Sequence, residues 1–175
     1  MSVGKKKITL SLSSAGINRA IKELEMYEQE IERKTALLQD RIAKRLETLV
    51  KQGFAGAMVD QSIRLGGRSP KVSVSIENRE QISVIIANGE DAVWVEFGAG
   101  VFHNGSVGSS PHPKGGELGF LIGGYGQGKG KQKAWSYYEN GELRVTHGTP
   151  AQMPMYNAVK IVCQEIVDIA KEVFT

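Results

Sequence analysis

The segment "GGYGQGKGK" at residues 123–131 comes close to a nucleotide-binding signature, which raises the question of whether the chain handles phosphate. Gly123, Gly128 and Lys129 match the G-x-x-x-x-G-K part of a P-loop, but the next residue is glycine where Ser or Thr would bind Mg²⁺. A P-loop also leaves a buried strand and opens a helix whose amides bind phosphate. Here only three apolar residues precede the glycines, and a predicted β-hairpin follows. We therefore interpret the segment as a glycine-rich loop and expect no cofactor.

Lys129, Lys131 and Lys133 could contact the phosphates of a nucleic-acid backbone without reading its sequence. The chain has 22 basic and 19 acidic residues, however, and its net charge of +3 is too nearly balanced for a dedicated nucleic-acid binder. No apolar stretch approaches the roughly 20 residues of a membrane span. We expect a protein that is cytosolic when made and has no membrane partner, with a non-specific nucleic-acid-binding module as one open alternative.

The three histidines, His103, His112 and His147, could form a zinc site together with Glu96 or Glu117. None of them has the tight spacing of an HExxH helix or of a comparable ligand pair. A metal-dependent hydrolase using these histidines stays open as an alternative, while the interpretation we favour is that they are solvated or capping residues. The chain also lacks a G-x-S-x-G nucleophile elbow. We therefore expect a protein that is not an enzyme.

Glu96 stands between two apolar residues and next to a glycine in "VWVEFGAG", where a carboxylate could act as a general acid or base. The sequence places no second carboxylate beside it as a catalytic partner. An ion pair between subunits, or a cap on a nearby backbone amide, is the interpretation we favour. The aromatic residues are interpreted as core or interface residues: Trp94, Phe97, Trp135, Tyr137 and Tyr138.

The elements that must position these residues begin with a long helix, predicted from about Ser14 to Gln52. Its apolar stripe follows a 4–3 spacing through almost five heptads. The stripe comprises Ile17, Ile21, Leu24, Glu28, Ile31, Thr35, Leu38, Ile42, Arg45 and Leu49. Ser13 or Ser14 can cap its start, and Gly53 can end it.

The predicted helix is too long for the body of a chain of this size. About 36 helical residues at roughly 1.5 Å each reach roughly 54 Å, whereas a compact chain of 175 residues has a radius of gyration near ~16 Å. We expect the helix either to overhang its domain or to break, and the stripe of an overhanging helix to contact either the C-terminal helix or a neighbouring subunit. The polar residues Glu28, Thr35 and Arg45 in the stripe favour a partly wet contact over a permanent coiled coil.

The middle of the chain changes to the alternating pattern of strands. Apolar residues at 72, 74 and 76, a turn at 77–80 and apolar residues at 82, 84 and 86 predict a β-hairpin. Ile85 joins its apolar neighbours in the second strand, which favours burial on both faces and a central position in a sheet. The segment 91–97 is ambiguous between a short helix and a strand.

The second half of the chain contains a long loop, a hairpin and a helix. Residues 98–130 hold 12 of the chain's 21 glycines and predict a long loop, in which "SSPHPKGG" at 109–116 is expected to be an exposed turn. Asn140-Gly141 predicts a type I′ turn between two strands. The last helix starts near Pro154 and runs through apolar residues at 155, 159, 162, 166, 169 and 173. Cys163, the single cysteine, is expected to be buried in it.

Together these segments predict a single α+β domain over residues 1–175. It should contain an antiparallel sheet of about four strands, a long N-terminal helix, a C-terminal helix and a long glycine-rich loop at 98–130, with a flexible start at 1–13.

Four short segments carry a resemblance to a known family: "VWVEFGAG", a spacer with "SPHP" and "GYGQGKG", "AWSYYENGELRVTHG" and "TPAQMPMYNAV". Together they resemble the neck, head–tail joining or tail-completion (minor tail) proteins of long-tailed bacteriophages and prophages. Glu96-Phe97-Gly98 is similar to the family's acidic-aromatic-glycine turn, with Ala99 where threonine is frequent. Gly148, Pro150, Ala151 and Pro154 are similar to the start of its final helix, with Met155 where phenylalanine is frequent.

The resemblance implies a structural virion component without catalytic residues, made in the bacterial host cytoplasm and assembled into a ring. Its partners would be copies of itself and neighbouring head-connector and tail proteins, with at most passing contact with DNA. A ring needs a patch that meets a different patch on the next copy. The candidate subunit-interface residues are Ile21, Leu24, Ile31, Leu38, Trp94, Glu96, Phe97, Pro154 and Met155. We also expect the loop at 98–130 to become ordered on assembly.

Overall fold

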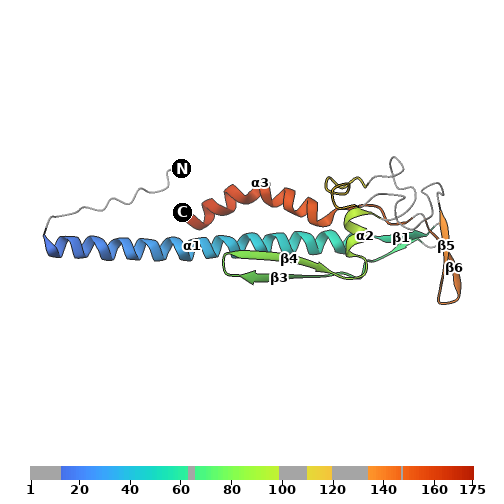
Figure 1. Cartoon of the computed structure of the whole chain (residues 1–175), viewed down its shortest axis with the longest axis horizontal. Helices are drawn as coiled ribbons and strands as arrows, with labels where there is room; N and C mark the ends of the chain where they lie inside the picture. Colours follow the sequence, from blue (N-terminus) through green and yellow to red (C-terminus); the bar gives the residue numbers. More distant parts are fainter. Residues whose placement is uncertain (1–12, 63–65, 99–109, 120–133, 147) are drawn as a thin grey trace.

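The computed structural model of the protein describes residues 13–62, 66–98, 110–119, 134–146 and 148–175. A long helix, α1 (Ser14–Ala55), forms the axis of the molecule (Figure 1). Helix α3 (Pro154–Phe174) lies along one side of α1, and a hairpin of β3 (Ser73–Arg79) and β4 (Ile82–Asn88) lies along another. The predicted α+β class, with a long N-terminal and a shorter C-terminal helix, is confirmed.

Helix α1 begins where its sequence predicts and ends later. The Ser13 hydroxyl oxygen accepts a hydrogen bond from the Gly16 amide at 3.1 Å, which caps the first turn. Salt bridges one turn apart follow along the exposed side, such as Lys44 to Asp40 at 2.8 Å. The prediction that Gly53 ends the helix is wrong. The helical hydrogen bonds continue to Gly56, whose amide donates to the carbonyl of Gln52 at 3.0 Å.

The β3–β4 hairpin packs one face on α1. Directly paired residues share a face, so Val74 with Ala87 and Ile76 with Ile85 point to the helix. Ile85 therefore packs inward, while Ile82 and Ile86 on the other face are exposed. The predicted central position of this strand is wrong, because within the described chain β4 pairs with β3 alone.

The turn of this hairpin is also tighter than predicted. The ladder continues to the pair Arg79 with Ile82, so that only Glu80 and Gln81 form the turn. Glu80 adopts a positive φ of 43°.

A separate four-stranded antiparallel sheet lies at the end of the molecule opposite the free end of α1 (Figure 1). Its order is β2 (Gly66–Arg68), β1 (Val59–Ser62), β6 (Glu142–Thr146), β5 (Trp135–Glu139). Asn140 and Gly141 both have positive φ, at 51° and 81°, which confirms the predicted type I′ turn. The prediction missed β1 and β2, because short strands rich in glycine and polar residues lack an apolar alternation.

The segment that was ambiguous between helix and strand forms α2 (Ala92–Phe97), which packs against the start of α3. The hydrophobic core lies where α1, β1, α2 and α3 converge. Its buried members are Val50, Phe54, Ala57, Val59, Val95 and Ala158. The core thus occupies the C-terminal third of α1 and leaves the other end of this helix without a share in it.

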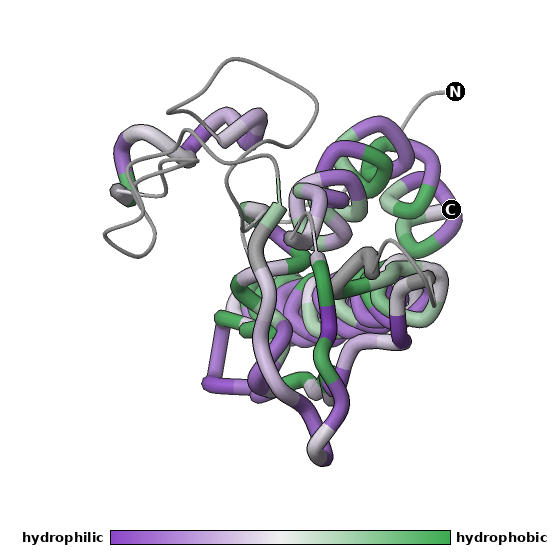
Figure 2. The backbone as a smooth tube through the Cα atoms, turned by 90° about the vertical axis from the view of Figure 1, so that its right-hand side faces the viewer, coloured by the Kyte–Doolittle hydropathy of each residue, from purple (hydrophilic) through white to green (hydrophobic). Residues whose placement is uncertain are grey.

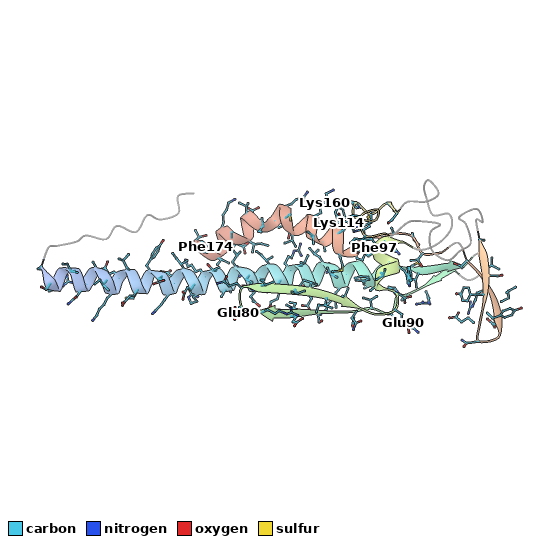
Figure 3. All side chains as sticks on the ribbon, viewed as in Figure 1. Glu80, Glu90, Phe97, Lys114, Lys160 and Phe174 are labelled. Carbon is cyan, nitrogen blue, oxygen red and sulfur yellow. The ribbon has the colours of Figure 1, made fainter. Side chains whose placement is uncertain are left out.

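Helix α3 runs antiparallel to α1. Gly53 allows the close approach at its start, because a Cβ there would lie 2.7 Å from the Cβ of Pro154. Arg45 then forms two hydrogen bonds with Glu165, and the Lys34 ammonium lies 5.9 Å from the ring centre of Phe174 near the C-terminus of α3 (Figure 3). No helix in the described part of the chain combines the length and hydropathy that a bilayer span requires.

Candidate functional site

Glu96 is a buried carboxylate that caps the first turn of α3 from a different element. Its Oε2 accepts the amide hydrogen of Met155 at 2.8 Å, and its Oε1 accepts that of Tyr156 at 2.9 Å. Residue Met153, which precedes the helix, supplies no side-chain cap. A negative charge at this position satisfies free amides and is favoured by the helix dipole. Of the two interpretations of Glu96, the structure shows the cap on backbone amides, but these amides are 59 and 60 residues away in the sequence.

His112 is the third partner of this carboxylate, with Nε2 at 3.2 Å from Oε1 of Glu96. The Lys114 amide donates to Nδ1 at 3.0 Å, so the ring proton belongs on Nε2 and is donated to Glu96. Phe97 and Tyr156 pack against the imidazole at ring-centre distances of 4.4 and 5.4 Å. His112 is 7% exposed.

The exposed turn predicted at 109–116 is confirmed at Pro111, Pro113, Lys114 and Gly116, whereas His112 and Gly115 are buried. The prolines and glycines do form turns, but the segment is fastened to the body at two points. One is the Glu96–His112 contact, and the other is a hydrogen bond from the Ser110 hydroxyl to the carbonyl oxygen of Phe97. His112 is a buried capping residue and not a solvated one, because the carboxylate and two aromatic rings enclose it.

Sequence reasoning missed a second buried carboxylate, Asp91. Arg68 forms two hydrogen bonds with it, at 2.7 and 2.8 Å, and the Lys71 amide adds a third at 2.7 Å. The hydrogen bonds from Arg68 hold the pKa of Asp91 below its usual value, since they favour the charged form. The carboxylate joins β2 and the segment before β3 to the start of α2. No short sequence motif predicts such a contact.

The buried Glu96 and His112 side chains are both occupied by hydrogen bonds within the subunit. Both oxygens of Glu96 accept N–H donors, and both ring nitrogens of His112 are engaged, so a metal ion at His112 would have to displace one of these contacts. Within the described residues no group of three or more His, Cys, Asp or Glu side chains could hold a metal ion. His103 and His147, the other histidines of the hydrolase alternative, lie outside the described residues.

A depression of about 400 Å³ opens between the end of α1 and the start of β3. Among its described lining residues Lys51 alone is ionisable, and it is paired with Glu47 at 2.9 Å. The depression therefore offers no acid–base pair for catalysis.

The feature with an evident capacity for binding is the free half of α1. The tip of the β3–β4 hairpin reaches α1 at Gln39, whose amide contacts Ser83 at 3.0 Å, and α3 ends near Lys34. Residues 14–33 project beyond both (Figure 1), over roughly 30 Å at about 1.5 Å per residue. The predicted overhang of the helix is confirmed.

Apolar side chains line one face of this projecting half of α1. Ile21 is 48% and Leu24 54% exposed, and Ile17 and Ile31 are exposed on the same face. We call these four residues the α1 stripe. A row of aliphatic side chains open to water is the kind of surface that marks a contact with another molecule.

The other candidate interface residues divide by position. Leu38 is half-buried, and Met155 packs against the core. Glu96 and Pro154 are buried inside the subunit, so the structure corrects their placement at a surface between subunits. Trp94 and Phe97 are half-buried beside them. Lys129, Lys131 and Lys133, the candidate phosphate contacts, lie outside the described residues, as does most of the loop at 98–130.

A second apolar row, on α3, was not separated from its core face by sequence reasoning. Val159 and Ile166, predicted on the apolar face of this helix, are exposed, and Cys163 is exposed with them, which corrects the prediction that it is buried. The row comprises Tyr156, Val159, Cys163, Ile166, Val167, Ala170 and Phe174, and we call it the α3 stripe. The 3–4 spacing of this row can be read from the sequence. When one helix carries two apolar rows side by side, however, the sequence does not show which row is buried.

Comparisons with protein-family models, with curated proteins and with solved structures gave no match to this chain.

Proposed function

We propose that this protein is a structural virion component of a tailed phage or prophage, which joins or completes the head–tail connection through ring assembly and without catalysis. The observation that carries the proposal is the α1 stripe, an apolar row on the half of α1 that neither α3 nor the β3–β4 hairpin reaches. The sequence resemblance of residues 93–159 to neck and tail-completion proteins supplies the class of assembly.

The free half of α1 has an energetic reason to find a partner. Covering four half-exposed aliphatic side chains contributes on the order of 1 kcal/mol each. This is enough to drive association when it is repeated around a closed ring, in which each copy uses one patch to cover a different patch of the next. A permanently monomeric protein would gain nothing from keeping these side chains in water.

The buried polar groups fit a structural role as well. Glu96 joins the acidic-aromatic-glycine turn at 96–98 to the start of α3, so the two segments that carry most of the resemblance meet in space. A carboxylate occupied by three N–H donors serves to hold α2, α3 and the turn at 110–119 in one arrangement. A rigid body of this kind suits a component that must fit between two neighbours.

Deletion of the gene from the phage or prophage that carries it tests the proposal. We expect the mutant to accumulate filled heads and free tails that electron microscopy shows unjoined, with infectious particles restored by the gene supplied in trans. Normally joined particles in the mutant would overturn the proposal. Flanking genes for connector and tail proteins would support it independently.

A further inference from the structure

We infer that the α1 stripe of one subunit docks on the α3 stripe of a second copy of the chain. The inference rests on the proposed ring assembly and specifies the two surfaces that meet. Both stripes are exposed in the subunit, and both lie on regular helices. Seen along the long axis of the molecule, hydrophobic and hydrophilic positions alternate around the helices (Figure 2).

The two stripes share their spacing, and the α3 stripe is long enough to cover the α1 stripe. The α1 stripe follows a 4–3 spacing from Ile17 to Ile31, with Glu28 at one of its positions, and the α3 stripe follows a 3–4 spacing from Tyr156 to Ala170. Such spacing is the pattern by which two helices interlock side chains along a shared seam. At about 1.5 Å per residue the α1 stripe is roughly 21 Å long, and the α3 stripe, which continues to Phe174, is roughly 27 Å long.

The stripes cannot meet within one subunit. Phe174, the last residue of α3, lies close to Lys34 of α1. The α1 stripe at residues 17–31 therefore lies beyond the C-terminus of α3 (Figures 1 and 3). The α3 stripe also lies on a different face of α3 from Ala158 and Val162, which are buried. Two separate patches on one subunit favour a head-to-tail contact that repeats from copy to copy.

Charge favours this pairing over the pairing of two α1 stripes. Exposed Glu25, Glu28 and Glu32 lie in or beside the α1 stripe. Lys160 and Lys171 border the α3 stripe on one side of the helix, and Lys171 pairs with Asp168 at 2.7 Å. Two α1 stripes face to face would bring carboxylates together, whereas the mixed contact sets these carboxylates beside Lys160.

Cys163 lies in the middle of the α3 stripe and makes the contact testable by disulfide trapping. One full-length protein keeps Cys163 and carries an affinity tag. The second is untagged, carries Cys163→Ala, and has one new cysteine in the α1 stripe at Ile17, Ile21, Leu24 or Ile31. Matched controls place the new cysteine at Lys22 or Arg33, which are also exposed but lie on another face of α1.

After mild oxidation of the mixture we expect at least about tenfold more mixed disulfide from the best stripe position than from the controls, because docking raises the local thiol concentration towards the mM range. Trapping detects even a weak contact, since each bond accumulates once formed. Equal yields from stripe and control positions overturn the inference. A majority of disulfides between two α1 cysteines, or between two Cys163 side chains, also overturns it. A yield of mixed disulfide that rises only when residues 1–12 are removed overturns it as well.

The result separates this inference from the proposed function. If the mixed disulfide fails to form while the gene deletion still leaves heads and tails unjoined, the docking mode is wrong and the function stands. If the disulfide forms and the deletion has no effect on particles, the protein assembles through these stripes for another purpose.

Discussion

Oε1 of Glu96 lies 3.2 Å from Nε2 of His112 inside the subunit, and the same carboxylate accepts the amide hydrogens of Met155 and Tyr156. One side chain thus joins three segments that are distant in sequence: α2, the turn at 110–119 and the start of α3. This contact makes the Glu96 carboxylate the most informative position for testing the architecture of the body.

Replacement of Glu96 by Gln should lower the free energy of unfolding by about 2 kcal/mol. The amide retains one acceptor oxygen but turns its NH₂ group towards an N–H donor, since both carboxylate oxygens accept such donors. Urea denaturation measures the change. Glu90→Gln is the control, because the side chain of Glu90 is almost fully exposed and its replacement should cost less than about 0.5 kcal/mol. Equal losses in the two variants would contradict the assignment.

His112→Ala should loosen the turn at 110–119 and spare the start of α3. Without the imidazole the Lys114 amide loses its acceptor, while Glu96 still accepts from Met155 and Tyr156. Hydrogen exchange should therefore quicken at residues 114–119 and stay slow at the first turn of α3. Unchanged exchange in the turn would show that the Ser110 anchor suffices by itself.

Gly53→Ala should destabilise the protein although alanine is the better helix former. The new Cβ would lie 2.7 Å from Pro154 Cβ, and the cost of forcing the helices apart exceeds the helix-propensity gain of about 1 kcal/mol. We expect a net loss of about 1 kcal/mol by thermal or urea unfolding. Gly56→Ala is the matched control, since its Cβ would meet only backbone oxygens at ordinary distances of 3.5 and 4.0 Å. A loss confined to the control would contradict the packing argument.

Asp91 should make stability depend on pH in the acid range. Its pKa in the folded state lies below the usual value of about 3.9 because Arg68 stabilises the charge. The contribution is therefore complete above about pH 4 and is lost as the pH falls towards the lowered pKa. Asp91→Asn should remove about 2 kcal/mol at pH 7 and flatten the acid limb of the stability curve. Urea unfolding from pH 2 to 7 measures both, and a parallel acid limb in the variant would refute the assignment.

The double replacement Ile21→Ser with Leu24→Ser should weaken self-association without weakening the fold. Both side chains are about half exposed in the subunit, so the free energy of unfolding of the monomer should change by less than about 1 kcal/mol. Loss of the apolar surface should raise the dissociation constant about tenfold or more. Analytical ultracentrifugation over a range of concentrations checks this, with Lys22→Ser as the control. An unchanged dissociation constant would show that the α1 stripe is not part of the interface.

The sequence by itself determined the elements whose signals are local. The 3–4 spacing and the Ser13 cap predicted α1 and its overhang, Asn140-Gly141 predicted the β5–β6 turn, and Pro154 marked the start of α3. In each case the hydrogen bonds or apolar contacts that decide the structure join residues close together in the sequence. A window of a few turns therefore contains the physical cause.

Tertiary structure alone decided which groups meet. It chose which of two apolar rows on α3 is buried, placed Ile85 inward and Ile82 outward, and made Gly53 a contact instead of a helix end. It also brought Glu96 to amides 59 and 60 residues away. These outcomes depend on which surfaces pack against each other in the folded chain. The sequence around a carboxylate does not indicate which distant N–H donors will form hydrogen bonds with it.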